Sequence, residues 1–450
     1  MADKKIFSIL LLLCMVTAAS AQSFFDVKKY GAKNDSTQLA TRAIAKAIDA
    51  ASKTGGGTVY FPAGKYLTGP IHLKSNITIL LDAGAELHFS DNFDHYLPMV
   101  RSRWEGIDVV NFSPLFYGEY LENITITGRG TINGHGKKWW AYSEVEVKKS
   151  PGSKWQDEFK RLNQNVIAPD LPGWIERGFL RPPFIQFMNC NNVLIEGITI
   201  RNSPFWTVNP EFCENVTIKG ITIINPPSPN TDGINPESCR YVHISDCHIS
   251  VGDDCITIKS GKDRAGRKMA APAENYTITN CTMLSGHGGI VIGSEMSGGV
   301  KKIVISNCIF DGTDRGIRIK TARGRGGVVE DIRVSNIIMK NIKDQAIVMD
   351  MQYVKTKEEP VSERTPRFRN IHLSNISADA SKAGYLNGLE EMPIENVSFN
   401  NINIHAKTGF VIRAAKNISF TQVRITAETG KAIDARQVKQ LSVDGLTKDF

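Results

Sequence analysis

Four short polar motifs in one stretch of the chain hold the residues best suited to acid–base chemistry. In order, they are Asn230–Asp232, Gly252–Asp254, Gly286–Gly288 and Arg318–Lys320. Three carboxylates brought close together repel one another, so at least one of them must have a raised pKa. A protonated acid beside ionised carboxylates is the combination that glycoside hydrolysis needs. The motifs therefore predict that Asp232, Asp253 and Asp254 act together as catalytic groups.

Basic and polar residues beside these aspartates fit supporting roles. His287 stands between two glycines, where we expect it to tune an aspartate or to contact the substrate. Arg318 and Lys320 are two residues apart on an expected strand, so their side chains point the same way and can grip a carboxylate. The predicted catalytic residues are Asp232, Asp253, Asp254 and His287, and the predicted substrate-binding residues are Asn230, Lys259, Arg318 and Lys320.

Each of these residues taken alone has a simpler interpretation, as a turn residue or a solvated charge. The spacing favours the chemical interpretation, because Asp232 precedes Asp253 by 21 residues and the later motifs follow at longer intervals. If each interval is one coil of a repeating structure, all four motifs share one face. Neighbours on a regular strand point to opposite faces, so we expect Gly252 to permit an unusual backbone that turns both Asp253 and Asp254 into one cleft.

The elements that must position these motifs form a repeat of short alternating strands separated by polar or glycine bends. Copies occur at residues 124–128, 192–200, 215–223, 241–249, 276–281, 303–310, 332–337, 371–376, 397–402 and 418–420. Such a repeat predicts a solenoid, because no single unit can bury its apolar face alone. The predicted fold is all-β, a single right-handed parallel β-helix. A β-sandwich is the alternative, but the Asn-Gly or Asp-Gly hairpin turns that it needs are scarce.

Asparagine, aspartate and cysteine recur after the strands of this repeat. We expect them to stack at an internal bend, where side-chain amides can satisfy backbone groups. Seven cysteines remain after Cys14 is set aside, and no Cys-x-x-Cys pair is present. An odd count argues against a fully paired disulfide framework, and the missing pair argues against a zinc site. The cysteines are interpreted as small core residues.

The ends of the chain differ from the repeat. Lys4 and Lys5, a short apolar run and Ala19–Ala21 predict a signal peptide over residues 1–21 and a secreted or periplasmic protein. A membrane anchor is the alternative, but the apolar run is shorter than the roughly 20 residues that span a bilayer. Apolar residues at helical spacing predict a helix over residues 36–53, capped by Asp35 or Ser36 and ended by Gly55–Gly57. We expect this helix to cover the first coil.

Residues 22–450 are expected to form one catalytic domain with a loop-rich insertion at about 90–185. This insertion carries Trp104, Trp139, Trp140, Trp155 and Trp174, with Arg101, Arg103, Arg177 and Arg181. Aromatic rings in long loops suit a sugar-binding rim. Loops of this length could wall off one end of a groove and favour cleavage from a chain end. The alternative is that they pack on the outside of the solenoid.

Taken together, the four motifs resemble those of glycoside hydrolase family 28, the polygalacturonases. Residues 25–32 and 55–64 are similar to the N-terminal opening of that family, so the resemblance covers most of the chain. It extends to bacterial exo-acting members. The resemblance implies a right-handed parallel β-helix that hydrolyses α-linked galacturonic acid in pectin with inversion, and that needs no metal or other cofactor.

The resemblance also implies roles for individual residues. Asp253 is the implied general acid, Asp232 and Asp254 position and deprotonate a water, His287 supports the acid, and Arg318 and Lys320 bind substrate carboxylate. Inversion implies acid and base carboxyl groups roughly 6.5–9.5 Å apart. The chain departs from the family pattern at Asn235, where many members carry Asp. Asp254 favours galacturonan, because fungal rhamnogalacturonan hydrolases tend to carry Glu there.

The net charge of +8 suits an anionic partner, which by charge alone could be nucleic acid, anionic lipid or an acidic polysaccharide. The motifs favour an acidic plant polysaccharide and argue for no nucleic-acid partner, no membrane span and a monomer. A rhamnogalacturonan hydrolase, a β-helical pectate lyase and a non-enzymatic adhesin are the alternatives. A lyase of the pectate type needs a calcium-binding carboxylate set, and an adhesin does not need polar motifs stacked on one face.

Overall fold

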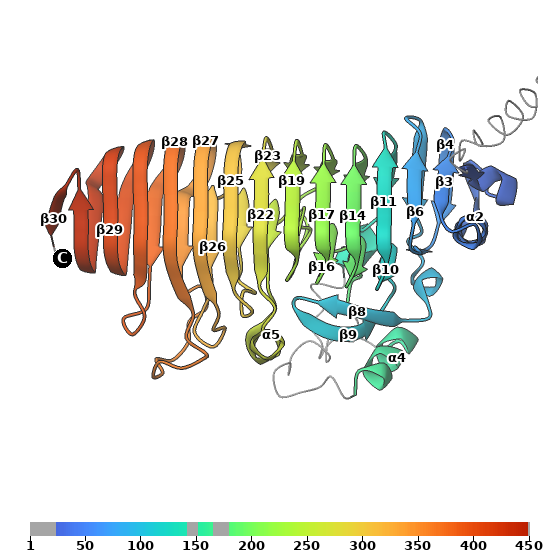
Figure 1. The fold of residues 1–450 in the computed structure, drawn as a ribbon, viewed down its shortest axis with the longest axis horizontal. Helices are drawn as coiled ribbons and strands as arrows, with labels where there is room; N and C mark the ends of the chain where they lie inside the picture. The colour runs from blue at the N-terminus through green and yellow to red at the C-terminus, as the bar shows by residue number, and fades with distance from the viewer. Residues whose placement is uncertain (1–23, 142–151, 165–179, 449–450) are drawn as a thin grey trace, which may run out of the picture.

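The chain forms an all-β solenoid, a long parallel β-helix whose coils stack along one axis (Figure 1). This computed structural model describes residues 24–141, 152–164 and 180–448. The predicted signal peptide lies outside these residues. Within them, no helix is long and apolar enough to cross a membrane. The predicted fold class is confirmed, and the predicted alternative of a β-sandwich is not observed.

One stack of parallel strands runs the length of the solenoid. Its members are β1 (Phe24–Asp26), β3 (Gly57–Phe61), β6 (Ile77–Leu81), β11 (Glu122–Gly128), β14 (Asn191–Glu196), β17 (Glu214–Lys219), β19 (Arg240–Ser245), β22 (Ala273–Thr279), β25 (Val300–Asp311), β27 (Val328–Asp350), β28 (Arg367–Asn387) and β29 (Ile394–Val443). The last four strands are long because they continue around the bends of the coil.

A second stack lies beside it in each coil. It holds β2 (Asp35–Leu39), β4 (Gly64–Thr68), β7 (Ala85–Phe89), β12 (Thr131–Asn133), β15 (Thr199–Arg201), β18 (Thr222–Ile224), β20 (His248–Ser250) and β23 (Thr282–Ser285). The second stack then joins the later part of β25.

The third stack carries the polar motifs, and we call it the site-bearing stack. It holds β5 (Ile71–His72), β10 (Phe116–Glu119), β13 (Ile185–Met188), β16 (Val208–Glu211), β21 (Ile256–Ile258), β24 (Ile290–Ile292) and β26 (Ile317–Lys320). Isolated bridges at Ile234 and Glu237 insert one further coil between β16 and β21. The end of β27 extends the stack beyond β26.

In-register apolar side chains explain why the coils stack. Ile126 pairs with Ile195, Ile195 with Ile218, and Ile218 with Ile244. Each of these side chains is at most 1% exposed. Parallel strands lie about 4.8 Å apart, so one inward position per strand becomes a continuous apolar column when the coils stack. A lone coil would leave that column in water.

The recurring asparagines lie at outer bends, and the prediction that they stack at an internal bend is wrong. Asn336 and Asn375 are exposed and have φ values of 57° and 54°, a left-handed conformation that Asn tolerates better than most residues. The side-chain amide of Asn401 donates to Asn375, that of Asn375 donates to Asn336, and that of Asn336 donates to Asn307. The amides therefore bond mainly to one another, in a ladder along the surface.

The seven cysteines of the described chain are free and buried, as predicted for core residues. They are Cys190, Cys213, Cys239, Cys247, Cys255, Cys281 and Cys308. Their thiols donate to main-chain carbonyls, as in the 3.2 Å contact of Cys213 with Phe187.

The first coil is covered by the helix α2 (Thr41–Lys53), preceded by the short 3-10 helix η1 (Val27–Tyr30) (Figure 1). Ala43, Ile44, Ala47, Ile48 and Ala51 form its buried face. The predicted start of the helix was too early, since residues 35–39 form β2 and pair with β4. Ala40 occupies the N-cap without a side-chain hydrogen bond, so the predicted cap at Asp35 or Ser36 is wrong. The end agrees with the prediction.

The predicted insertion at about 90–185 is not continuous. Residues 116–133 form a regular coil through β10, β11 and β12, because their alternating apolar residues fit all three stacks. Before this coil, the chain forms η2 (Phe93–Tyr96) and the antiparallel hairpin of β8 (Val100–Trp104) and β9 (Ile107–Asn111). After it, the chain forms the helices α3 (Lys137–Trp140) and α4 (Lys154–Leu162). The remaining described elements are α5 (Asp263–Met269) and β30 (Leu446–Lys448), which pairs antiparallel with β29.

Two of the tryptophans in this region are core residues. Trp104 stacks on Phe205 with ring centroids 4.9 Å apart, and Trp139 packs on Phe93 at 4.0 Å. Trp104 is 5% exposed and Trp139 is fully buried, so the predicted sugar-binding rim does not apply to them. Trp174 and Arg177 lie outside the described residues.

Candidate active site

All eight residues predicted for the site line one cleft of about 480 Å³. Asp232, Asp253, Asp254 and His287 lie at the beginning of the strands of the site-bearing stack, and Lys259 and Lys320 lie at their ends. Arg318 comes from within β26, and Asn230 from the loop before the Ile234 bridge. The structure thus brings every predicted residue together.

Strand register places the acidic motifs on adjacent coils. Ile234 pairs with Ile256, and Ile256 pairs with Ile290. The amide of Gly233 donates to the carbonyl of Asp254 at 3.0 Å, which sets Asp232 beside Asp254. Three motifs that are distant in sequence therefore meet because their following strands are in register.

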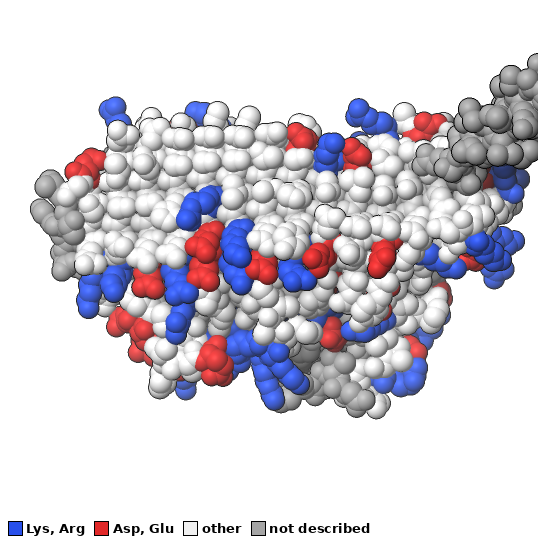
Figure 2. Space-filling view, viewed as in Figure 1, with Lys and Arg blue, Asp and Glu red and all other residues white. Residues whose placement is uncertain are grey.

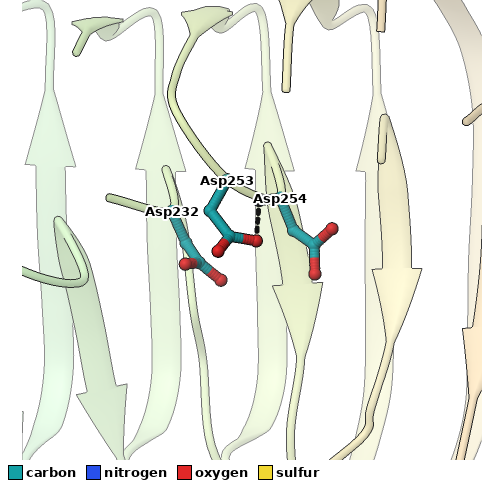
Figure 3. Close-up of side chains that lie close together, drawn as sticks. All are labelled: Asp232, Asp253 and Asp254. Carbon is teal, nitrogen blue, oxygen red and sulfur yellow. Dashed lines mark hydrogen bonds between the residues drawn. The ribbon is translucent and has the colours of Figure 1, made fainter. Parts of the chain in front are cut away.

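The backbone at Asp253 and Asp254 is irregular, which lets both carboxylates face the cleft. Residues 251–255 precede β21 and are not part of a strand. The amide of Asp254 donates to Oδ1 of Asp253 at 2.8 Å, as Figure 3 shows. Gly252 is needed for close packing, since a Cβ there would lie 2.4 Å from the backbone nitrogen of Ser228. The predicted irregular backbone is thus observed, and Gly252 permits it by close packing.

One carboxylate oxygen from each of Asp232, Asp253 and Asp254 lies within 4.8 Å of the other two (Figure 3). These nearest oxygens are closer than the roughly 6.5–9.5 Å separation expected for an inverting pair. A water that hydrogen-bonds to two carboxylates at about 2.8 Å spans about 4.5 Å between them. The cluster is therefore the right size for one shared water.

Cations hold Asp254 in its ionised form. Burial raises the pKa of Asp254, but Lys320 and Arg318 oppose this and the net pKa is below its ordinary value. The ammonium of Lys320 lies 2.8 Å from Oδ2 of Asp254, and Arg318 lies 3.4 Å from Oδ1. Asp254 is 1% exposed, so these contacts are little screened by solvent.

The pKa of Asp232 is shifted in the opposite direction to that of Asp254. Burial raises its pKa well above the ordinary value, and the charge of Asp253 raises it further. Asn235 donates to Oδ2 of Asp232 at 2.8 Å, whereas Oδ1 has no hydrogen-bond partner among the described residues. The departure from the family pattern at Asn235 therefore supplies a hydrogen-bond donor to Asp232. This oxygen is itself buried, which adds to the cost of ionising Asp232.

His287 contacts the more accessible aspartate. Its Nδ1 lies 3.2 Å from Oδ1 of Asp253. This hydrogen bond raises the pKa of His287, while partial burial opposes the rise. The side chain of Asp253 is 20% exposed. Asp253 is therefore the carboxylate of the three that reaches furthest into the open cleft.

Several residues of the cleft were not predicted. They include Glu105, Trp206, Lys262, Glu295, Asp314, Arg315, Arg325 and Tyr353. Lys259 lies 2.9 Å from Glu295 and 4.4 Å from the centre of the Trp206 ring. Burial lowers the pKa of Lys259, but Glu295 and Asp232 outweigh this effect and raise it overall. Most of the missed residues stand in loops, where no repeat pattern marks them.

A buried ion cluster fixes the β8–β9 hairpin to the site-bearing stack. Arg103 lies 2.7 Å from Glu211 and 2.5 Å from Glu237, and it also contacts Asp108 at 2.6 Å. Arg103 is 5% exposed and both glutamates are fully buried. Removing one partner of such a cluster would leave an uncompensated buried charge. Arg103 is therefore a structural anchor of the hairpin.

The chemistry of the donors fits a water better than a metal ion. Three carboxylates alone could approach a cation, but Asp254 is already paired with Lys320 and Arg318. Calcium takes 6–8 oxygen ligands, and the amide of Asn235 and the hydroxyl of Thr257 beside Asp232 donate rather than accept. The cluster thus resembles a proton-transfer site.

The fold and the site together define a class, the polysaccharide-cleaving enzymes built on a parallel β-helix. A family model for glycosyl hydrolases family 28 matches residues 176–434. A second model, described as rhamnogalacturonase A/epimerase, pectate lyase-like, matches residues 24–152. The chain belongs to glycosyl hydrolase family 28 and is a glycoside hydrolase.

Individual relatives agree with this assignment. The chain is 33% identical to a probable polygalacturonase from Vitis vinifera, over 84% of this chain and 73% of that protein. It is 27% identical to an exo-poly-alpha-D-galacturonosidase from Dickeya chrysanthemi, over 81% of this chain and 64% of that protein. The crystal structure of an exopolygalacturonase from Thermotoga maritima superposes with a TM-score of 0.81 at 33% identity, covering 90% of this chain and 92% of that one.

Proposed function

We propose that this protein hydrolyses the linkages between α-linked galacturonic acid units of pectin. The observation that carries the proposal is the cluster of three aspartates beside Lys320 and Arg318 in one cleft. Carboxylates supply acid and base, and the cations match the negative charge of a uronic acid. The names of the relatives, which include polygalacturonases and an exo-galacturonosidase, support this choice of substrate.

Asp253 is the proposed general acid. It is the most accessible of the three carboxyls, and it alone can approach a glycosidic oxygen in the open part of the cleft. Contact with His287 orients the carboxyl for proton transfer.

Asp254 and Asp232 are proposed to hold the attacking water. Asp254 is ionised at neutral pH and can accept a proton from water, and one carboxylate oxygen of Asp232 lies within 4.8 Å of one of Asp254, close enough to share that water. In a single displacement, the water oxygen bonds to the anomeric carbon as the glycosidic bond breaks. One water proton passes to the base, and Asp253 protonates the leaving oxygen. The configuration at the anomeric carbon inverts.

Recognition of the acidic sugar is assigned to the cationic half of the cleft. Lys320, Arg318 and Lys259 line it, with the ring of Tyr353 lying 5.2 Å from the ammonium of Lys320. Asn230 lies beside them, and its side-chain oxygen accepts a 2.7 Å hydrogen bond from Arg181. We propose that these groups orient the substrate carboxylate and the adjacent hydroxyls.

We further propose that cleavage starts from a chain end. The turn of the β8–β9 hairpin places Glu105 at the cleft, and Glu105 contacts Lys262 at 3.0 Å. The backbone of Gly106 packs closely on Lys262, since a Cβ at Gly106 would lie 2.8 Å from the nitrogen of Lys262. The hairpin thus meets the segment before α5 and closes one side of the cleft. Such a wall favours binding of a chain terminus.

The proposed enzyme would be exported, with a leader removed after Ala21, and would act as a monomer.

Product analysis tests the activity. Purified protein is incubated with homogalacturonan and with rhamnogalacturonan, and early products are resolved by anion-exchange chromatography. Saturated monogalacturonate from homogalacturonan is the expected result. Products from rhamnogalacturonan alone would contradict the proposal, and products with an unsaturated end would indicate a lyase.

A further inference from the structure

A second polar hollow adjoins the catalytic cleft at the carboxyl ends of the site-bearing strands. It has a volume of about 360 Å³ and is formed by α5 and by the loops that follow β26 and β27. Five arginines and one acidic residue are among its lining side chains: Arg264, Arg267, Arg323, Arg325, Arg364 and Asp263. We call it the arginine hollow. Lys and Arg side chains gather over α5 in Figure 2.

The arginine hollow borders the cleft at Arg325. Arg325 lines both, and Tyr353 of the cleft is followed in sequence by Val354 of the hollow. Arg325 lies 3.0 Å from Asp263 and 3.9 Å from Glu295, so it forms the partition between the two spaces. A chain leaving the cleft over Arg325 would enter the hollow directly.

The arginine hollow also retains positive charge that the protein does not neutralise. Arg264 is exposed, and its guanidinium has no hydrogen-bond or ion-pair partner in the part of the chain that the structure describes. Arg267 donates to the carbonyls of Gly324 and Arg325, which are neutral. By contrast, Arg323 is bidentate on Glu391, and Arg364 is paired with Glu359. Two arginines without a carboxylate partner in a concave site attract anions.

We propose that the arginine hollow binds carboxylates of the galacturonan chain beyond the sugars next to the cleaved bond. The inference rests on the proposed function, which supplies a polymer with one carboxylate per unit. A binding site outside the reaction centre increases affinity for a long chain without any new contact at the bond that breaks. A dimer bound at the aspartates would not extend into the hollow. The enzyme would therefore prefer polymer to dimer through this site.

Steady-state kinetics on a long unesterified polygalacturonate and on digalacturonate test the proposal. The variants are Arg264→Glu and Arg264→Glu/Arg267→Gln in the full chain. Lys268→Glu is the matched control, because it makes the same charge change on α5 outside the hollow. For Arg264→Glu, KM on the polymer should rise about five-fold at low salt and less at high salt, as for an exposed charge contact. The double variant should show a larger rise.

Kinetics on digalacturonate distinguish a loss of binding in the hollow from damage to the fold. Values of kcat/KM on digalacturonate should change less than about two-fold in all variants. An unchanged polymer KM in the double variant would overturn the inference, as would an equal rise in Lys268→Glu or an equal loss on digalacturonate. A parent protein inactive on both substrates would instead refute the proposed function. Melting temperatures equal to the parent's confirm that the variants are folded.

Discussion

The carboxylate of Glu105 lies 3.0 Å from the ammonium of Lys262, although 157 residues separate them in sequence. Glu105 stands at the turn between β8 and β9, and Lys262 directly precedes α5. Both side chains are at most 21% exposed. The contact joins a hairpin from an early part of the chain to the coil that carries Asp253 and Asp254, and it forms one wall of the cleft.

Breaking this contact should make the enzyme less selective for cleavage at a chain end. In Glu105→Ala/Lys262→Ala, the hairpin opens more often, and the fraction of early products longer than monogalacturonate should rise by up to about five-fold, the effect of losing one partly exposed ion pair. Chromatography of products at low conversion measures it. Glu214→Ala/Arg240→Ala removes a surface pair on β17 and β19 and serves as control. Identical product profiles for parent and variant would argue against the wall.

Replacing the proposed general acid should lower turnover by about 10²–10⁴ while leaving the fold intact. For Asp253→Asn, kcat should fall by about 10²–10⁴, the usual contribution of general acid help. Asp246→Asn is the control, because Asp246 lies at an outer bend with φ of 60°, which Asn accepts well. Initial rates on polygalacturonate provide the measurement. Near-parental kcat in folded Asp253→Asn would exclude Asp253 as the acid.

The other two aspartates should affect stability in opposite directions. The folded pKa of Asp232 is raised, so its stabilising effect is fully present at low pH and is lost as pH rises through that folded pKa. Asp232→Asn removes a carboxyl whose burial disfavours the ionised form that it takes in the unfolded chain, so the melting temperature at neutral pH should rise by roughly a few degrees. Activity should fall in the same variant.

Asp254→Asn should instead destabilise the protein at neutral pH. Its folded pKa is lowered, so the stability that it contributes is present above the unfolded pKa and is lost as pH falls through the folded value. Without it, Lys320 and Arg318 are buried cations lacking their partner, at a cost of about 3 kcal/mol. Thermal unfolding between acidic and neutral pH compares the two variants. A stabilised Asp254→Asn protein would show that the cations do not depend on this carboxylate.

Arg318 and Lys320 have two possible roles, which esterified substrate can separate. If they bind substrate carboxylate, parent protein should prefer free over methyl-esterified galacturonan, and Lys320→Met and Arg318→Met should reduce that preference by about ten-fold. If they only keep Asp254 ionised, the variants should cleave both substrates more slowly by the same factor. The ratio of kcat/KM on the two substrates measures this, with Lys343→Met as a surface control. An unchanged ratio in both variants would remove the substrate-binding role.

The sequence by itself determined the solenoid and the approximate membership of the site. A two-residue alternation repeated along the chain allows the apolar side chains to be buried only if coils stack in register. In-register stacking then brings Asp232, Asp254 and Gly288 onto neighbouring coils, so the local motifs predicted the cluster. The seven free, buried cysteines follow from the same repeat.

Tertiary structure alone decided the boundaries of the cleft and the charge state of each aspartate. Glu105, Trp206 and Glu295 reach the site from loops whose paths depend on contacts distant in sequence, such as that of Arg103 with Glu237. Asp232 and Asp254 are chemically identical, yet their pKa values move in opposite directions. Asp232 is buried and forms no ion pair with a cation of the described residues, whereas Asp254 lies against Lys320. Such differences arise from desolvation and distance, which a linear sequence does not contain.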